Sequence, residues 1–219
     1  VYGIMSNGPC VVGENSQLVL TTCADEQYRT GQYFKYLLAA ETFGFEVKDN
    51  ADVSVISDLI GIQSDSSPYV QSGGTVVTNG IMVGLTPTGM KMTGGSLKAT
   101  GDTYGISMIQ GANIFEISGG TIEAAGGTRA LSVDTLLPLL PDVSKYENIK
   151  ILAGESASTA GQIANLPQTA AEYTYKYLKI YSGAEEPEVK YDLWIEGKQV
   201  TNKNAANILG NGTATFNAN

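Results

Sequence analysis

A loop between residues 25 and 36 has the composition of a ligand-binding surface, because it gathers tyrosine, phenylalanine, lysine, arginine and acidic side chains. Aromatic faces stack on the C–H faces of sugar rings, and charged groups hydrogen-bond the sugar hydroxyls. The ligand-binding residues that we predict are Tyr28, Arg29, Tyr33 and Tyr36, together with Tyr69 from a second, smaller loop. The alternative is that these rings only pin their loops onto the fold, because aromatic side chains bury large apolar areas.

Aspartates at predicted turns are a second group of candidates, here for calcium, which prefers oxygen ligands. They are Asp49, Asp52, Asp58, Asp65 and Asp102. No contiguous loop among them shows a known calcium-binding spacing. We therefore expect solvated turn carboxylates and no cofactor, and calcium stays an open alternative.

The ionisable residues also bear on catalysis. The chain contains no histidine, which excludes Ser-His and Cys-His mechanisms. A calcium-dependent polysaccharide lyase would need clustered carboxylates and a lysine or arginine base, and Arg29 and Arg129 are the only arginines. The chain contains a sequence repeat, described below, and no set of equivalent positions in it places a lysine or arginine among several carboxylates. We predict a protein that is not an enzyme, with a lyase as the alternative.

A repeated phrase organises the chain that must position these residues. It occurs at Ser72–Val76, Thr93–Leu97 and Ser118–Ile122, spaced 21 and 25 residues apart. A second phrase keeps step with it at Ile60–Ile62, Val83–Leu85, Tyr104–Ile106 and Arg129–Leu131. A fixed period of this size is typical of stacked repeats, and the Gly, Thr, Val and Ile content favours strands. We predict an all-β fold, a parallel β-solenoid with coils of about 21–25 residues.

The corners of this solenoid should superpose. Three residues before the apolar anchors Leu18, Val53, Val76, Leu97 and Ile122 stand Asn15, Asn50, Gly73, Gly94 and Gly119. Glycine and asparagine accept a positive φ at little steric cost, so we expect these residues to form the turns. A leucine-rich horseshoe is less consistent with the sequence, because regularly spaced leucines and an asparagine ladder are not present. Helical repeats are less consistent still, because there is no sustained 3.6-residue period.

The remaining chain predicts a capped solenoid with a separate tail. We expect residues 1–182 to form the solenoid, with a last coil strand at 148–152. A cap should cover 154–181, with one or two helical turns within 155–165 and a closing strand at 173–181. An acidic linker should cover 183–190. Residues 191–219 should form a β-hairpin tail or the start of a following module, with strands at Tyr191–Ile195 and Gln199–Thr201.

Charge and cysteine content limit the partners. The net charge of -9 argues against nucleic acid or an anionic membrane surface as a partner. There is no apolar run near 18 residues, so we expect no membrane insertion. Cys10 and Cys23 could form a disulfide or stay as two thiols, and the sequence leaves this open.

Two parts of the chain carry a resemblance. Tyr191–Ile195 with Gly197, Gln199–Thr201 and Asn207–Gly210 resembles the opening motif of Gly-rich modules in large surface proteins of gut Gram-positive bacteria. Ile151–Ala157 followed by Tyr177–Ile180 is similar to the way such modules end. The resemblance covers most of the chain, although its motifs are short and degenerate.

The resemblance implies a right-handed β-helix that is secreted or attached to the cell wall, in a family sometimes described as carbohydrate-binding. It supplies no catalytic residues, and it implies neighbouring modules in the same chain. The expected function is therefore non-catalytic glycan binding or adhesion at the bacterial cell surface, with a polysaccharide or a host or bacterial surface glycan as partner. The alternative is a purely structural spacer.

Overall fold

The computed structural model describes residues 3–22, 38–109, 115–133, 149–164, 166, 174–182, 190–201, 208–209 and 214–216. The chain divides into two compact units, Val1–Ser182 and Gly183–Asn219, which are treated separately below. The described residues form strands and turns without a helix, so none of them belongs to a helix long and apolar enough to cross a membrane.

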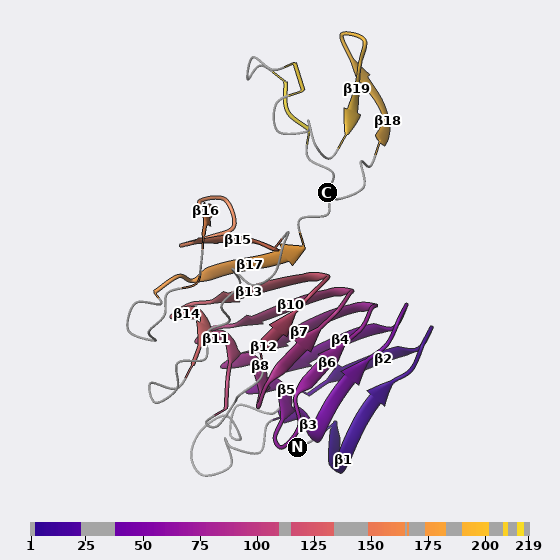
Figure 1. Ribbon diagram of the computed structural model, residues 1–219, viewed down its shortest axis with the longest axis vertical. Coiled ribbons are helices and arrows are strands. Elements are labelled where there is room, and N and C mark those ends of the chain that lie inside the picture. Colours follow the sequence, from indigo (N-terminus) through magenta and orange to yellow (C-terminus); the bar gives the residue numbers. More distant parts are fainter. Residues whose placement is uncertain are drawn as a thin grey trace. The chain divides into compact units, whose positions relative to one another are not determined.

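The first unit is a β-solenoid of about four turns, as the repeat predicts (Figure 1). Its first sheet, called sheet 1 here, has eight strands among the described residues, and the five that come from the coils run parallel, one above the other. They are β2 (Gln17–Thr21), β4 (Asp52–Ser57), β7 (Thr75–Gly80), β10 (Ser96–Gly101) and β13 (Thr121–Gly126).

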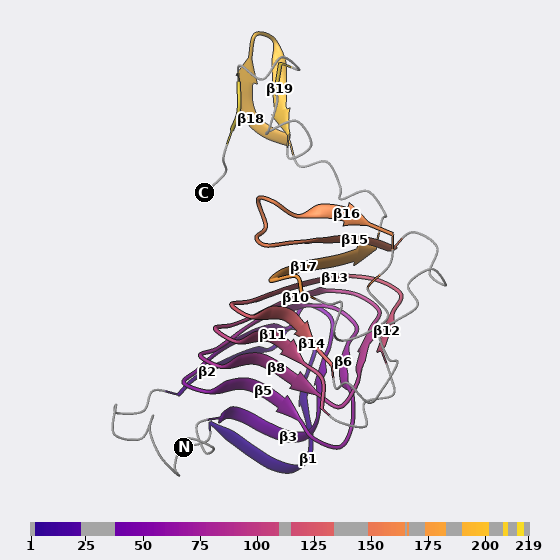
Figure 2. The same cartoon turned by 90° about the vertical axis from the view of Figure 1, so that its left-hand side faces the viewer.

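The other sheet, sheet 2, divides into two rows of strands (Figure 2). The long strands β1 (Ile4–Val12) and β3 (Leu38–Val47) contribute to both rows, because the first half of β3 pairs with β5 (Ile60–Ser64) and the second half with β6 (Tyr69–Gln71). The first row continues through β8 (Val83–Pro87), β11 (Tyr104–Ser107) and β14 (Arg129–Ser132), and the second through β9 (Met90–Met92) and β12 (Phe115–Ile117). Each complete coil therefore has three sides.

The register follows the sequence phrases. Gln17, Asp52, Thr75, Ser96 and Thr121 are successive partners in sheet 1, one residue before the apolar anchors. The second phrase aligns likewise in sheet 2, where Ile60, Val83, Tyr104 and Arg129 are partners. Alternate side chains of each strand point inward, so the anchors Val53, Val76, Leu97 and Ile122 form a completely buried ladder.

The corners correct one detail of the prediction. The positive φ angles in the first two coils are at Asn15 (56°) and Asn50 (57°), as expected. In the later coils, however, the positive φ belongs to the second glycine of each pair, not to Gly73, Gly94 or Gly119. These second glycines are Gly74 (70°), Gly95 (79°) and Gly120 (83°).

The first glycine of each pair is needed for a different reason, which is the close approach of the coil below. A Cβ on Gly94 would lie 2.3 Å from the carbonyl oxygen of Ser72, and one on Gly119 would lie 2.2 Å from that of Thr93. A side chain at either position would overlap the backbone of the preceding turn. The Gly-Gly pair therefore combines a tight stacking contact with a left-handed turn.

The cap differs from the prediction in two ways. Residues 148–152 were expected to form a last coil strand, but β15 (Ile149–Gly154) pairs antiparallel with β17 (Tyr177–Ser182) and belongs to the cap. The expected helical turns within 155–165 are absent from the described part of that range, which holds a turn and the short strand β16 (Gly161–Ile163). The closing strand is present as β17, which pairs antiparallel with β13 and so covers the last parallel edge.

The second unit contains the predicted hairpin, formed by β18 (Lys190–Ile195) and β19 (Lys198–Thr201). Its two turn residues, Glu196 and Gly197, have φ angles of 49° and 79°. Positive φ at both central positions is typical of the tight type I′ hairpin turn.

Candidate ligand-binding groove

Only one of the five residues predicted to bind a ligand belongs to the part of the chain that the structure describes. Tyr28, Arg29, Tyr33 and Tyr36 lie outside the described residues, as does Cys23. Cys10 is a half-buried free thiol, and burial raises its pKa. Of the predicted ligand-binding residues, Tyr69 alone can be placed.

Tyr69 is completely buried in the core, which does not fit the ligand-binding role predicted for it. Its ring stacks on that of Phe45 with a centroid distance of 6.2 Å and an interplanar angle of 8°. Its hydroxyl donates a hydrogen bond of 2.8 Å to Oε1 of Gln71, and burial raises its pKa. Gln71 stands two residues further along the same strand and so shares its face, a pattern that could have indicated a buried pair.

The turn aspartates do not form one cluster: Asp49 and Asp52 flank the same corner, whereas Asp58, Asp65 and Asp102 follow β4, β5 and β10. Asp58 is buried, and Oδ1 of Asp65 accepts a hydrogen bond of 2.6 Å from the amide of Gln63. Within the described ranges, no three Asp, Glu, Cys or His side chains are close enough together to hold a metal ion.

A groove of about 690 Å³, called the sheet 1 groove here, lies on the outer face of sheet 1. It crosses the C-terminal ends of β4, β7, β10 and β13 and reaches the cap. At about 4.8 Å per strand, the four intervals from β4 to β17 make it roughly 19 Å long. A hollow of this length and volume suits several units of an extended polymer.

The floor of the groove follows from the strand register. Ile56, Asn79, Thr100 and Ala125 are partners on successive strands and line the groove. The column runs from a large side chain to a small one, and the hydroxyl of Thr100 donates to Oδ1 of Asn79. Small and polar side chains here leave room above the sheet and offer hydrogen-bonding groups.

One side of the groove is formed by an ion pair two residues earlier on the same face. Nζ of Lys98 lies 3.1 Å from Oε1 of Glu123, its register partner on the next coil. Asp102, at the corner after β10, also lines the groove. This ion pair could be predicted from the sequence, because Lys98 stands three residues after Gly95 and Glu123 stands three residues after Gly120, at the equivalent position of the repeat.

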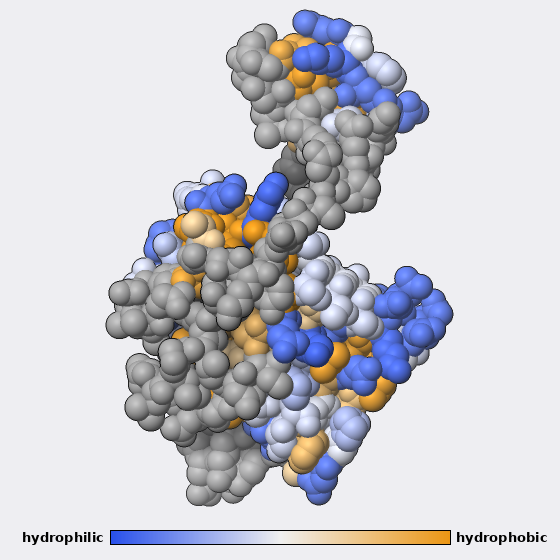
Figure 3. Space-filling view, viewed as in Figure 1, coloured by the Kyte–Doolittle hydropathy of each residue, from blue (hydrophilic) through white to orange (hydrophobic). Residues whose placement is uncertain are grey.

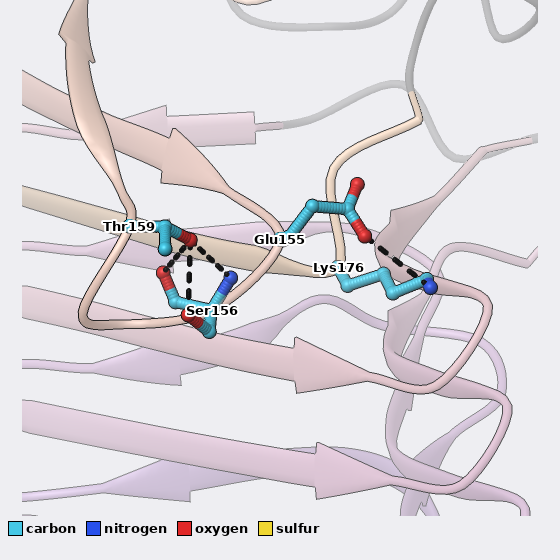
Figure 4. A network of polar contacts seen from close by, with 4 residues as sticks. All are labelled: Glu155, Ser156, Thr159 and Lys176. Carbon is cyan, nitrogen blue, oxygen red and sulfur yellow. Dashed lines mark hydrogen bonds and ion pairs between the residues drawn. The ribbon is translucent and has the colours of Figure 1, made fainter.

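The cap closes one end of the groove. Glu155 and Ser156 follow β15, and Lys176 precedes β17, so residues far apart in sequence meet there. Nζ of Lys176 lies 3.3 Å from Oε2 of Glu155 (Figure 4). Beside this pair, Oγ1 of Thr159 accepts a hydrogen bond of 3.1 Å from the backbone N–H of Ser156, which holds the turn closed (Figure 4).

Tyr177 connects the cap to the floor. It is the register partner of Ala125 and lines the groove, although most of its ring is covered. Burial raises its pKa, and the nearby negative charge of Glu123 raises it further. The phenol therefore stays protonated at neutral pH.

Among the described residues, two lysines and three carboxylates line the groove, and each lysine is paired with a glutamate. Apolar patches on the visible face of the molecule are separated by polar ones (Figure 3). In the groove, Ile56 and Ala125 can contact C–H groups, while Asn79 and Thr100 can hydrogen-bond hydroxyls. Sequence reasoning missed this groove, because Glu155 and Lys176 reach it only through the antiparallel cap.

Comparison with known proteins identified no relative of this chain. No family model matches it, and neither a curated protein nor a solved structure is significantly similar to it.

Proposed function

We propose that this protein is a non-catalytic β-solenoid module that binds a polysaccharide along the sheet 1 groove, outside the cell or at the bacterial cell surface. The observation that carries the proposal is the groove itself: about 690 Å³, open along the stacked strands and lined by both apolar and hydrogen-bonding groups. The extracellular location and the neighbouring modules rest on the sequence resemblance alone.

The shape of the groove favours a polymer. Stacked strands repeat the same side-chain positions at a fixed distance, and a polysaccharide repeats the same hydroxyls along its chain. Thr100 and Asn79 offer polar groups on the floor, and Lys98 with Glu123 offers charged ones at the side. Tyr28, Arg29, Tyr33 and Tyr36 are proposed as further contacts to the same glycan.

A glycan array that includes cellulose, xylan, mannan and uronic acid oligosaccharides tests the proposal. We expect binding to at least one class, and we expect Thr100→Leu, which fills the floor, to weaken that binding about tenfold or more. Ser54→Leu is the matched control, because Ser54 is also a half-buried outward position of sheet 1 but does not line the groove.

The outcomes separate the competing functions. Binding that is lost in Thr100→Leu but kept in Ser54→Leu supports the groove, and loss on Tyr28→Ala or Tyr33→Ala supports the loop contacts. If the intact chain binds no glycan on the array, the result would favour a structural spacer. Calcium-dependent release of unsaturated products from a uronic acid polymer would instead favour a lyase.

A further inference from the structure

A second hollow, called the Phe43 cleft here, lies on the outer face where β1 and β3 bend, and it does not share residues with the sheet 1 groove. Its volume is about 320 Å³, at the lower end of the range for small-molecule sites. The residues that give it chemical character are Met5, Asn7, Glu41, Phe43, Asp65 and Ser66.

The cleft presents an aromatic ring to solvent. Phe43 is 44% exposed and Met5 is 64% exposed, whereas Phe45, two residues further along, is buried in the core. The backbone at Phe43 is held in place, because its carbonyl oxygen accepts hydrogen bonds from the N–H groups of Ser66 (3.0 Å) and Ser67 (2.7 Å). A single exposed aromatic side chain is ordinary on a protein surface. Phe43 differs in lining a cleft beside exposed Met5 and the carboxylates of Glu41 and Asp65.

The charged residues described around Phe43 are all negative. Glu41 and Asp65 are carboxylates, and no lysine or arginine occurs among the described residues that line the cleft. Asp65 is oriented by the 2.6 Å hydrogen bond from the amide of Gln63. In contrast, the carboxylates Glu123 and Glu155 in the sheet 1 groove are each paired with a lysine.

We propose that the Phe43 cleft binds an amino sugar unit of a polysaccharide. The ring of Phe43 would contact the C–H face of the sugar and attract its ammonium group, since a cation is stabilised over an aromatic face. Glu41 and Asp65 would accept charge-assisted hydrogen bonds from the ammonium group. The side chains of Asn7 and Ser66 would hydrogen-bond the remaining hydroxyls.

Isothermal titration of the intact chain with hexaglucosamine and with hexa-N-acetylglucosamine tests this site. The second oligomer has the same rings without the positive charge. We expect hexaglucosamine to bind about tenfold or more tightly than the acetylated oligomer, and we expect added salt to reduce the difference. Phe43→Ala, Glu41→Gln and Asp65→Asn should each weaken hexaglucosamine binding about tenfold, because each removes the ring or one acceptor.

Glu14→Gln is the matched control, because it removes one negative charge from an exposed turn elsewhere. It should leave the affinity unchanged, and circular dichroism should show all variants folded. Equal loss of affinity in Glu14→Gln would indicate general attraction to an acidic protein and overturn the proposal, as would equal binding of the two oligomers. Binding of hexalysine at equal or higher affinity, with the same dependence on Phe43, would replace the sugar by a peptide. Thr100→Leu should not affect hexaglucosamine, so this test is independent of the sheet 1 groove.

Discussion

The hydroxyl of Tyr69 donates a 2.8 Å hydrogen bond to Oε1 of Gln71, and both side chains are completely buried. Nε2 of Gln71, which carries two hydrogens, lies within hydrogen-bond distance of the carbonyl oxygens of Gly73 (3.0 Å), Gly74 (3.2 Å) and Ser96 (3.2 Å). A buried amide thus satisfies a buried phenol and ties it to two adjacent corners. The pair thereby links the end of β6 to the corner before β7 and to the start of β10 on the next coil.

Replacement of Gln71 by methionine, the residue found one coil further at Met92, should destabilise the protein by about 1–3 kcal/mol. The cause is the loss of partners for the Tyr69 hydroxyl and for the corner carbonyls. Urea unfolding of Gln71→Met, Tyr69→Phe and the double variant measures the coupling between the two side chains. The double variant should be destabilised by less than the sum of the two single changes, and strict additivity would contradict the pairing.

Gly94→Ala should destabilise the solenoid by about 1–3 kcal/mol, because the new Cβ would lie 2.3 Å from the carbonyl oxygen of Ser72. Gly161→Ala is the matched control, since a Cβ on Gly161 meets nothing within 4 Å. The free energies of unfolding of the two variants decide the matter. Similar values for both would show that the corners are not packed as described.

Asn50 tests the left-handed corner of an early coil, where its φ is 57°. Asn50→Ala should cost about 1–2 kcal/mol, because a β-carbon without a compensating polar group disfavours this backbone conformation. Asn50→Gly should be close to neutral or stabilising, since glycine adopts positive φ freely. Chemical denaturation should therefore rank Gly above Ala at this position, and the reverse order would argue against the observed turn.

The stability of the protein should fall at alkaline pH. Burial raises the pKa of Tyr69 and of Tyr177 above the ordinary value of 10.0, so the folded chain keeps phenolic protons that the unfolded chain releases. The contribution of these groups is fully present below about pH 10 and is lost as the pH rises further. Tyr69→Phe should flatten the pH dependence of unfolding between pH 9 and 11, and an unchanged slope would contradict the burial of this hydroxyl.

The sequence was sufficient for the register of the solenoid, because the same glycine and apolar letters return at each corner. Thr75, Ser96 and Thr121 could be aligned by inspection, and they are partners in sheet 1. Which glycine of each pair adopts the positive φ could not be predicted, since both residues permit it. Both glycines of a pair also lie close to the coil below, as Gly94 and Gly95 do, so this contact does not distinguish them either.

The cap and the groove were harder to predict because they depend on contacts between distant residues. The apolar alternation of Ile149–Gly154 is the same in a parallel coil and in an antiparallel cap, so the pairing with β17 left no mark in the sequence. Lys176 reaches Glu155 only after this pairing. Tyr69 was predicted as a ligand contact from its residue type, and the structure buries it against Phe45.

The most direct test of the sheet 1 groove is a map of backbone amide chemical shifts during titration of the intact chain with cellohexaose, xylohexaose and mannohexaose. For at least one of them, we expect the shifts to change at the groove, in residues 79–81, 98–102, 123–127, 155–157 and 176–177. The amides of β6 and β9, on another side of the coil, should stay unchanged. Shift changes confined to residues outside the groove, or none with any of the three sugars, would contradict polysaccharide binding at this site.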